Sequence, residues 1–220
     1  MPTIVQNYNP PLEPYLEILH EDADLLVINK PSGLLSVPGR IEAHQDSVAS
    51  RAVAYNADAR IVHRLDMETS GIILLALNKQ AHRHIGLQFE RRHTEKRYSA
   101  RVFGAVEADS GSIDQPLICD WPNRPRQMVD HEKGKASLTH YSVTEREENA
   151  TRLSLRPVTG RSHQLRVHMQ WLGHPILGDP LYAEGPALAA ADRLQLHAEL
   201  LTIHHPTGGE KITFESPPNF

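Results

Sequence analysis

The segment HRLDMETSGIILLAL spans residues 63–77 and joins a polar loop to an unbroken apolar run. The run from Gly71 to Leu77 contains no polar side chain, which is typical of a strand buried on both faces. Asp66 lies in the loop just before this strand, so a rigid element fixes the position of a carboxylate. Such a carboxylate can act as a nucleophile or as a base. An isolated aspartate in a loop also commonly caps a turn, and the segment alone leaves both interpretations open.

The rest of the sequence predicts short strands joined by turns, with a few helices. Strands are expected at residues 15–20, 25–28, 98–103, 137–145, 151–157, 194–204 and 211–215. Helices are expected at 46–56 and 79–92, and from a Ser162 cap to about Leu172, with Gly173 as the stop signal. Because strands outnumber helices and follow one another along the chain, we predict an α+β fold. Its sheet should be long, mixed and mostly antiparallel, with flanking helices.

Composition excludes several classes of protein. The chain has 220 residues, 40% of them apolar and 23% charged, as in an ordinary globular protein. Cys119 is the single cysteine, which rules out an intramolecular disulfide framework and a cysteine-rich zinc site. No apolar run approaches the ~20 residues of a membrane span, and no signal peptide is visible. We therefore expect no membrane partner and a reducing, cytoplasmic setting.

The charge is unevenly distributed along the chain, although the net charge is only −4. Residues 82–101 contain six Lys/Arg and two Glu, which gives +4, and residues 151–178 contain four Arg and no acid, which gives another +4. The remaining residues therefore carry −4 − 8 = −12. Two positive segments on an acidic body can steer a polyanion to one face. Two solvated surfaces explain the same pattern equally well.

The second candidate motif is TGRSHQLRVH at residues 159–168. A glycine turn opens a predicted helix here, and the free amides of a helix start favour anions. Arg161 and Arg166 add charges that can bind phosphate or pair with a carboxylate. His163 and His168 are five residues apart and do not have the spacing of an H-E-x-x-H zinc motif, so a metal-dependent hydrolase is a weak hypothesis. An amphipathic helix with solvated arginines is the alternative interpretation.

The third candidate is the run from Glu95 to Tyr98, in which Lys96 and Arg97 precede an aromatic residue that enters a strand. RNA-binding sites often stack an unpaired base on such a ring. A strand tyrosine in a protein core is the more common outcome.

Taken together, four motifs resemble the RluA family of pseudouridine synthases in order and spacing. They are KPSGL at 30–34, HRLD at 63–66, KRY at 96–98 and GRSHQLR at 160–166. The resemblance runs from about residue 15 to the C-terminus, and the pairing of HRLD with GRSHQLR is highly specific. It implies the pseudouridine synthase catalytic fold with a central cleft, and no metal or organic cofactor. We expect an N-terminal arm at 1–14 and a catalytic domain at 15–220, without an S4 or PUA module.

The resemblance also implies roles for individual residues. Asp66 matches the essential aspartate, Tyr98 the tyrosine that packs on the target base, and Arg166 the basic residue paired with the catalytic carboxylate. Arg64 is a candidate to enter the gap that the target nucleotide leaves. The expected RNA-binding residues are His63, Arg64, Arg91, Arg92, Lys96, Arg161 and His163, and a lesser set is Arg124, Arg126, Lys133 and Lys135.

The chain is similar to the short subgroup of the family, and this likeness implies two RNA substrates. These are the tRNA anticodon stem-loop at uridine 32 and a 23S rRNA hairpin at uridine 746. The target base must be flipped out of its stack before it can react. We expect a monomer. The alternative from another class is a non-catalytic protein or chaperone that binds RNA stem-loops.

Overall fold

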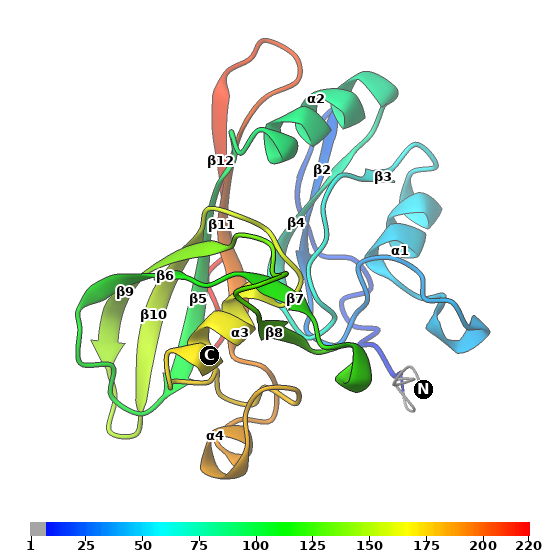
Figure 1. Cartoon of the computed structure of the whole chain (residues 1–220). Helices are drawn as coiled ribbons and strands as arrows, with labels where there is room; N and C mark the ends of the chain where they lie inside the picture. Colours follow the sequence, from blue (N-terminus) through cyan, green and yellow to red (C-terminus); the bar gives the residue numbers. More distant parts are fainter. Residues whose placement is uncertain (1–7) are drawn as a thin grey trace. The chain divides into compact units, whose positions relative to one another are not determined.

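The predicted buried strand is β4 (Ser70–Ala76), and every one of its residues is buried. The computed structural model describes residues 8–220 and divides into two compact units (Figure 1). Of the described residues, the terminal unit contains 8–96 and 197–219, and the central unit contains 97–196 and Phe220.

The sheet of the terminal unit is built around β4. Its strands follow the order β1 (Ile18–Glu21), β2 (Leu25–Lys30), β4 and β11 (Leu196–His204). In addition, β3 (Arg60–Ile61) pairs with β4, and β12 (Lys211–Glu215) pairs with β11. The β4–β11 pair is parallel, whereas the other pairs in this unit are antiparallel. The sheet is therefore mixed and mostly antiparallel, as predicted.

Two helices pack in the terminal unit, together with a 3-10 turn, η1 (Glu42–His44). The first is α1 (Val48–Tyr55), which confirms the predicted helix and begins with a reciprocal capping box between Ser47 and Ser50. The second is α2 (Lys79–Glu90), where the Asn78 side chain accepts a hydrogen bond from the Ala81 amide. Ile85 of α2 belongs to a buried cluster with apolar residues of β2, β4 and β11. An apolar stripe thus fixes α2 against the sheet that carries the 62–69 loop.

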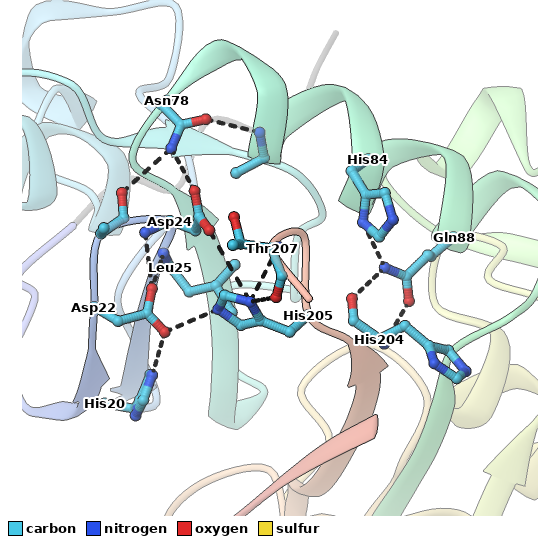
Figure 2. Close-up of polar contacts among 12 residues, drawn as sticks. His20, Asp22, Asp24, Leu25, Asn78, His84, Gln88, His204, His205 and Thr207 are labelled. Carbon is cyan, nitrogen blue, oxygen red and sulfur yellow. Dashed lines mark hydrogen bonds and ion pairs between the residues drawn. The ribbon is translucent and has the colours of Figure 1, made fainter. Parts of the chain in front are cut away.

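A polar cluster joins three turns of the terminal unit (Figure 2). One Asp22 oxygen accepts two backbone amides of its own turn, and the other lies 2.8 Å from His20 Nε2 and 3.1 Å from His205 Nε2. Asn78 donates to Asp24 Oδ1 at 2.7 Å and so links the start of α2 to the same turn. Burial opposes ionisation of Asp22, but these hydrogen bonds outweigh it and lower its pKa to about 2. The cluster thus connects the β1–β2 turn to the β11–β12 turn.

The central unit contains an antiparallel sheet and a separate hairpin. The sheet order is β5 (Glu95–Phe103), β10 (Ala150–Pro157), β9 (Leu138–Arg146) and β6 (Ser110–Asp114). The hairpin consists of β7 (Leu117–Cys119), η2 (Trp121–Asn123) and β8 (Gln127–Val129). Two helices complete the unit, α3 (Gln164–Trp171) and α4 (Gly185–Ala189). Leu165 and Met169 of α3 pack with β5 and β10 in one buried core.

Each predicted helix and strand has an observed counterpart, and the α+β fold class is confirmed, but β3, β6, β7, β8 and α4 were not predicted. One detail is wrong, because Ser162 does not cap α3. His163 is the N-cap residue, with a left-handed φ of 54° and no side-chain cap bond. At the other end, Gly173 has φ 89° and its amide bonds to the Gln170 carbonyl, which ends the helix as predicted.

Part of the predicted N-terminal arm, residues 1–7, lies outside the described residues. Residues 8–15 are tied to α1 by the buried Arg51 guanidinium, which donates to the Pro11 and Tyr15 carbonyls at 2.9 and 2.8 Å. Tyr8 donates to the Asp46 carbonyl at 2.8 Å.

Candidate active site

Asp66 lies in the loop between β3 and β4, and it is half-buried. Its carbonyl accepts the Thr69 amide at 3.1 Å, which closes a turn immediately before β4 begins. The strand is buried throughout, so the turn is anchored on a rigid support. The predicted placement of Asp66 in a loop before a buried strand is confirmed.

A second loop, residues 30–36, braces this turn on the side that follows Asp66. The Lys30 ammonium donates to three carbonyls, those of Pro31, Leu34 and Met67, at 2.9, 2.7 and 2.8 Å. The Gly33 amide donates to the same Met67 carbonyl at 3.0 Å. Gly33 has φ 84°, a backbone conformation that favours glycine. The residue after Asp66 is therefore held by two donors from this loop.

The same loop also binds the residue before Asp66. Ser36 is buried, and its Oγ donates to the Leu65 carbonyl at 2.6 Å and accepts the Leu65 amide at 3.0 Å. Ser32 Oγ donates to the Glu68 carbonyl at 2.8 Å. We call residues 30–36 the brace, because they bind the backbone on both sides of Asp66. A reacting side chain needs such a fixed backbone.

Lys30 also places a buried positive charge near the acids of the loop. It is fully buried, and burial lowers its pKa to about 7. The Glu68 and Asp66 carboxylates act in the opposite direction and favour its charged form. The three carbonyl acceptors match the three N–H groups of an ammonium.

His63 is directed into the terminal unit. Its Nε2 accepts the Leu74 amide at 2.9 Å, and its ring stacks on Phe89 at 4.5 Å between centroids. Burial, and then the Lys96 charge, lower the pKa of His63 to about 3. The ring is therefore neutral and links the HRLD segment to β4 and α2. Its neighbour Arg64 is exposed.

The end of α2 presents the predicted cationic residues. Arg91 and Arg92 are exposed, and Lys96 is half-buried. Arg92 has φ 59°, and the amides of Arg92 and His93 bond to the Phe89 and Gln88 carbonyls. This is a Schellman motif with an arginine at the position that usually holds glycine. Burial and the Arg92 charge both lower the pKa of Lys96, so these cations lie close enough to interact.

The remaining predicted residues belong to the central unit. Tyr98 lies in β5 opposite Leu155, is half-buried, and packs against the core of this unit. Arg166 is buried in α3 and makes a two-pronged ion pair with Asp179, with Nε–Oδ2 at 2.8 Å and Nη2–Oδ1 at 2.6 Å. Asp179 also accepts the amides of Leu181 and Tyr182.

Asp179 was missed from the sequence. The available signal was Arg166 itself, since an arginine on a buried helix face requires a carboxylate partner. The 27 acidic residues of the chain offered no means of choosing that partner.

The turn before α3 is organised by Gln164 rather than by Ser162. The buried Gln164 Oε1 accepts the Thr159 hydroxyl and the Arg161 amide, at 2.7 and 3.0 Å. Its Nε2 donates to the Leu138 carbonyl of β9 at 3.0 Å. Arg161 is exposed on this turn, and the His163 Nδ1 lies 2.7 Å from the Tyr182 hydroxyl.

The structure therefore groups the predicted residues in two sets, each within its own unit. In the terminal unit, Asp66 lies with Lys30 and Glu68, and His63 lies with Lys96. In the central unit, Arg166 and His163 share the neighbour Tyr182. Among residues 8–220, no three His, Cys, Asp or Glu side chains form a group that could hold a metal ion. In the same range, no helix has the length and apolar character of a membrane span.

Comparison with known proteins gives the family. The family model for RNA pseudouridylate synthases matches residues 24–171. The dual-specificity RNA pseudouridine synthase RluA of Salmonella typhi is 56% identical over 217 residues, which cover 98% of this chain and 99% of the relative. The protein of the same description from Escherichia coli K12 is 55% identical with the same coverage.

Solved structures agree with this result. Human RNA Pseudouridylate Synthase Domain Containing 1 superposes with a TM-score of 0.78 and 30% identity, covering all of this chain and 87% of that one. Human RNA Pseudouridylate Synthase Domain Containing 4 gives a TM-score of 0.73 at 25% identity, covering 92% of this chain and 89% of that one. The predicted family is confirmed: the chain belongs to the RNA pseudouridylate synthases and is an enzyme of the RluA type.

Proposed function

We propose that this pseudouridine synthase isomerises uridine in two stem-loop substrates, at uridine 32 of tRNA and at uridine 746 of 23S rRNA. The support is near full-length identity of 55–56% to relatives described as dual-specificity enzymes. The observation that carries the chemistry is the braced backbone on both sides of Asp66.

The reaction requires one well-placed group and little else. The C1′–N1 bond breaks, the detached uracil turns, C5 bonds to C1′, and the C5 proton leaves. We propose that the Asp66 carboxylate performs the key step. It would attack C1′, attack C6 or remove a ribose proton, and each route needs a carboxylate at a fixed position. Lys30 and Ser36 supply that fixed position through Met67 and Leu65.

The target base must leave its stack, at a cost of a few kcal/mol. We propose that Tyr98 packs on the flipped base, since stacking on an aromatic ring contributes roughly 1–3 kcal/mol per base. Arg64 is exposed and would enter the gap in the RNA. Arg166 would act beside the catalytic carboxylate, with its guanidinium plane fixed by Asp179.

The proposed RNA contacts are basic residues of each unit, of which Arg91, Arg92 and Arg161 are exposed. Arg91 and Arg92 would bind phosphates at the end of α2, with Lys96 beside them, and Arg161 and His163 would do so at the start of α3. For His63, its contacts with Leu74 and Phe89 favour a supporting role that positions the neighbouring Arg64. No metal or organic cofactor takes part in this scheme.

We further propose that residues 15–220 act as one catalytic domain with residues 1–14 as an arm. The protein would work as a monomer in the cytoplasm, where tRNA and rRNA are available. Sedimentation of the protein with and without a stem-loop would test whether it is a monomer in solution.

The test is tritium release from RNA that carries C5-tritiated uridine. We expect purified protein to release tritium from both stem-loops in the presence of EDTA. Asp66→Asn should abolish release while it keeps stem-loop affinity. Binding by the wild-type protein without release from any stem-loop would favour the alternative, a non-catalytic RNA-binding protein. Wild-type turnover by Asp66→Asn would show that another carboxylate is responsible.

A further inference from the structure

Tyr182 joins two separate elements of the central unit, although no motif pointed to it. It is almost fully buried, and its hydroxyl lies 2.7 Å from Nδ1 of His163, in the turn before α3. The same hydroxyl accepts the Gln127 amide of β8 at 2.8 Å. One side-chain oxygen therefore connects the start of α3 to the β7–β8 hairpin.

The ring of Tyr182 strengthens the same connection. The guanidinium of Arg126, from the hairpin, lies 5.4 Å from the ring centroid, and that of Arg166, from α3, lies 5.1 Å from it. Both distances lie within the range of cation–π attraction. Leu117 of β7 and Val167 of α3 belong to the same buried cluster as Tyr182. Polar and apolar contacts thus hold the same two elements.

Asp179 fixes the backbone that presents Tyr182. Its carboxylate accepts the Leu181 and Tyr182 amides at 2.9 and 3.2 Å while it holds Arg166. A single buried acid therefore sets both the arginine and the turn that carries the tyrosine.

Both connected elements carry side chains suited to RNA. The turn before α3 presents the exposed Arg161, and His163 there has a left-handed backbone, which is strained for a residue other than glycine. The hairpin tip presents Trp121, which is 64% exposed, with the Arg124 guanidinium 4.4 Å from its ring centroid. An exposed ring with a stacked guanidinium offers a base a stacking surface and a phosphate a charge.

We propose that Tyr182 is a positioning residue for RNA binding, which holds the His163 turn and the Trp121 hairpin in one fixed arrangement for a stem-loop. This inference rests on the proposed RNA substrate. It adds the hairpin tip, as an RNA-stacking surface, to the cationic residues named above.

The Tyr182 hydroxyl is in direct hydrogen-bond contact with the His163 ring. The Gln127 amide donates to the Tyr182 oxygen, and the same oxygen forms a hydrogen bond with Nδ1 of His163 whose direction depends on the ring tautomer. Because the hydrogen bond at one ring nitrogen influences where the ring proton lies, removing the hydroxyl should change the environment of the His163 nitrogens. Nitrogen-15 spectroscopy of the His163 ring therefore reports directly on the connection.

The test compares Tyr182→Phe with Ile176→Val. The first variant removes only the hydroxyl, and the second removes one methylene from the core of the same unit, for a similar loss of stability. We expect Tyr182→Phe to raise Kd and KM for the stem-loop about tenfold, as loss of one well-formed hydrogen bond predicts. The kcat at saturating RNA should stay within about twofold, and the nitrogen-15 signals of the His163 ring should change. Ile176→Val should change none of these.

The inference fails if Tyr182→Phe matches Ile176→Val in KM, or if it lowers kcat alone. A wild-type protein without tritium release would instead refute the proposed function. If Tyr182→Phe does not fold, Trp121→Ala provides the second test, because this exposed hairpin side chain is the stacking surface that the proposal adds and its removal leaves the core intact. We expect the same rise in KM from it, and an unchanged KM would overturn the proposal.

Discussion

Replacing Ser36 with alanine removes one hydroxyl from the brace and leaves the loop otherwise intact. That hydroxyl both donates to the Leu65 carbonyl, at 2.6 Å, and accepts the Leu65 amide, at 3.0 Å. Ser36 is only 4% exposed, so water does not replace these bonds without a local shift. The perturbation therefore acts on the peptide groups immediately before Asp66.

The size of the effect follows from the number of groups left without a partner. A buried peptide group that loses its hydrogen bond costs about 1–3 kcal/mol, and Ser36→Ala affects two of them. The loop will relax to recover part of this energy, so we expect the free energy of unfolding to fall by about 2 kcal/mol. The same relaxation displaces Asp66. A misplacement of about 1 Å can slow a reaction about 100-fold, and we expect kcat to fall at least tenfold.

The assay is single-turnover tritium release at saturating RNA, combined with thermal unfolding. Ser47→Ala is the matched control, because Ser47 is also buried in the terminal unit and caps α1 through the Ser50 amide. Loss of such a cap costs about 1 kcal/mol. Ser47→Ala should lower the free energy of unfolding and leave kcat unchanged, whereas Ser36→Ala should lower both the free energy of unfolding and kcat. Equal kcat values for the two folded variants would refute the role of the brace.

Three further predictions use the same protein and simple measurements. Arg92→Gly should relieve a left-handed backbone and raise Tm by about 2–4 °C, yet weaken stem-loop binding and reduce its salt slope by about one. An unchanged slope in binding titrations would remove Arg92 from the RNA surface. The pKa of Asp22 is about 2 in the folded protein, below its ordinary value of 3.8, so its ionised form stabilises the fold above pH 4. That stability, about 1 kcal/mol once solvent screening is allowed for, should disappear between pH 4 and 2. Asp22→Asn should flatten this part of the Tm–pH curve, and an equally steep curve would contradict the prediction. The pKa of Lys30 is lowered from 10.5 to about 7, so the unfolded chain binds the extra proton between these values and stability should rise with pH there. Lys30→Met should lack this rise in denaturant titrations, whereas a similar change at the exposed Lys79 should keep it.

The local sequence pattern was sufficient to predict most of the helices and strands. The apolar run at 71–77, the capped helix after Ser47 and the alternating strands at 137–157 each carry a signal within a few residues. The parallel pairing of β4 with β11 could not be read in this way, because it joins Ser70 to His197 across 127 positions. The short strands β6, β7 and β8 also lacked a signal, since each has only three to five residues.

The wrong cap at α3 has a different physical origin. Ser162 is a good N-cap residue by type, and no neighbouring residue argues against it. Gln164 provides the acceptor instead, from inside the helix, and reaches both the preceding turn and β9. A cap supplied from a later position depends on a tertiary contact, so residue preference alone selects the wrong side chain.

The motif residues of the candidate site could be selected from the sequence, whereas the residues that support them could not. Asp66, Tyr98 and Arg166 stand in motifs that can be compared with a family. Ser36, Asp179 and Tyr182 act through backbone groups and through side chains distant in sequence. Every residue has a backbone carbonyl that accepts and, except proline, an amide that donates, so the sequence does not show which group a support will bind.

Two residues of the family motifs are themselves supports for the loops of the candidate site. Lys30 and Gln164 are both buried, and their polar atoms mostly bind backbone groups in or beside the loops that carry Asp66 and Arg161. Burying an ammonium or an amide is unfavourable unless every hydrogen bond is made, so an apolar side chain would be the simpler choice for stability alone. A loop without such anchors samples many conformations, and a carboxylate on it would seldom meet a glycosidic bond at the right distance. The polar supports therefore favour a single loop geometry over maximal stability, which is what the proposed chemistry at Asp66 requires.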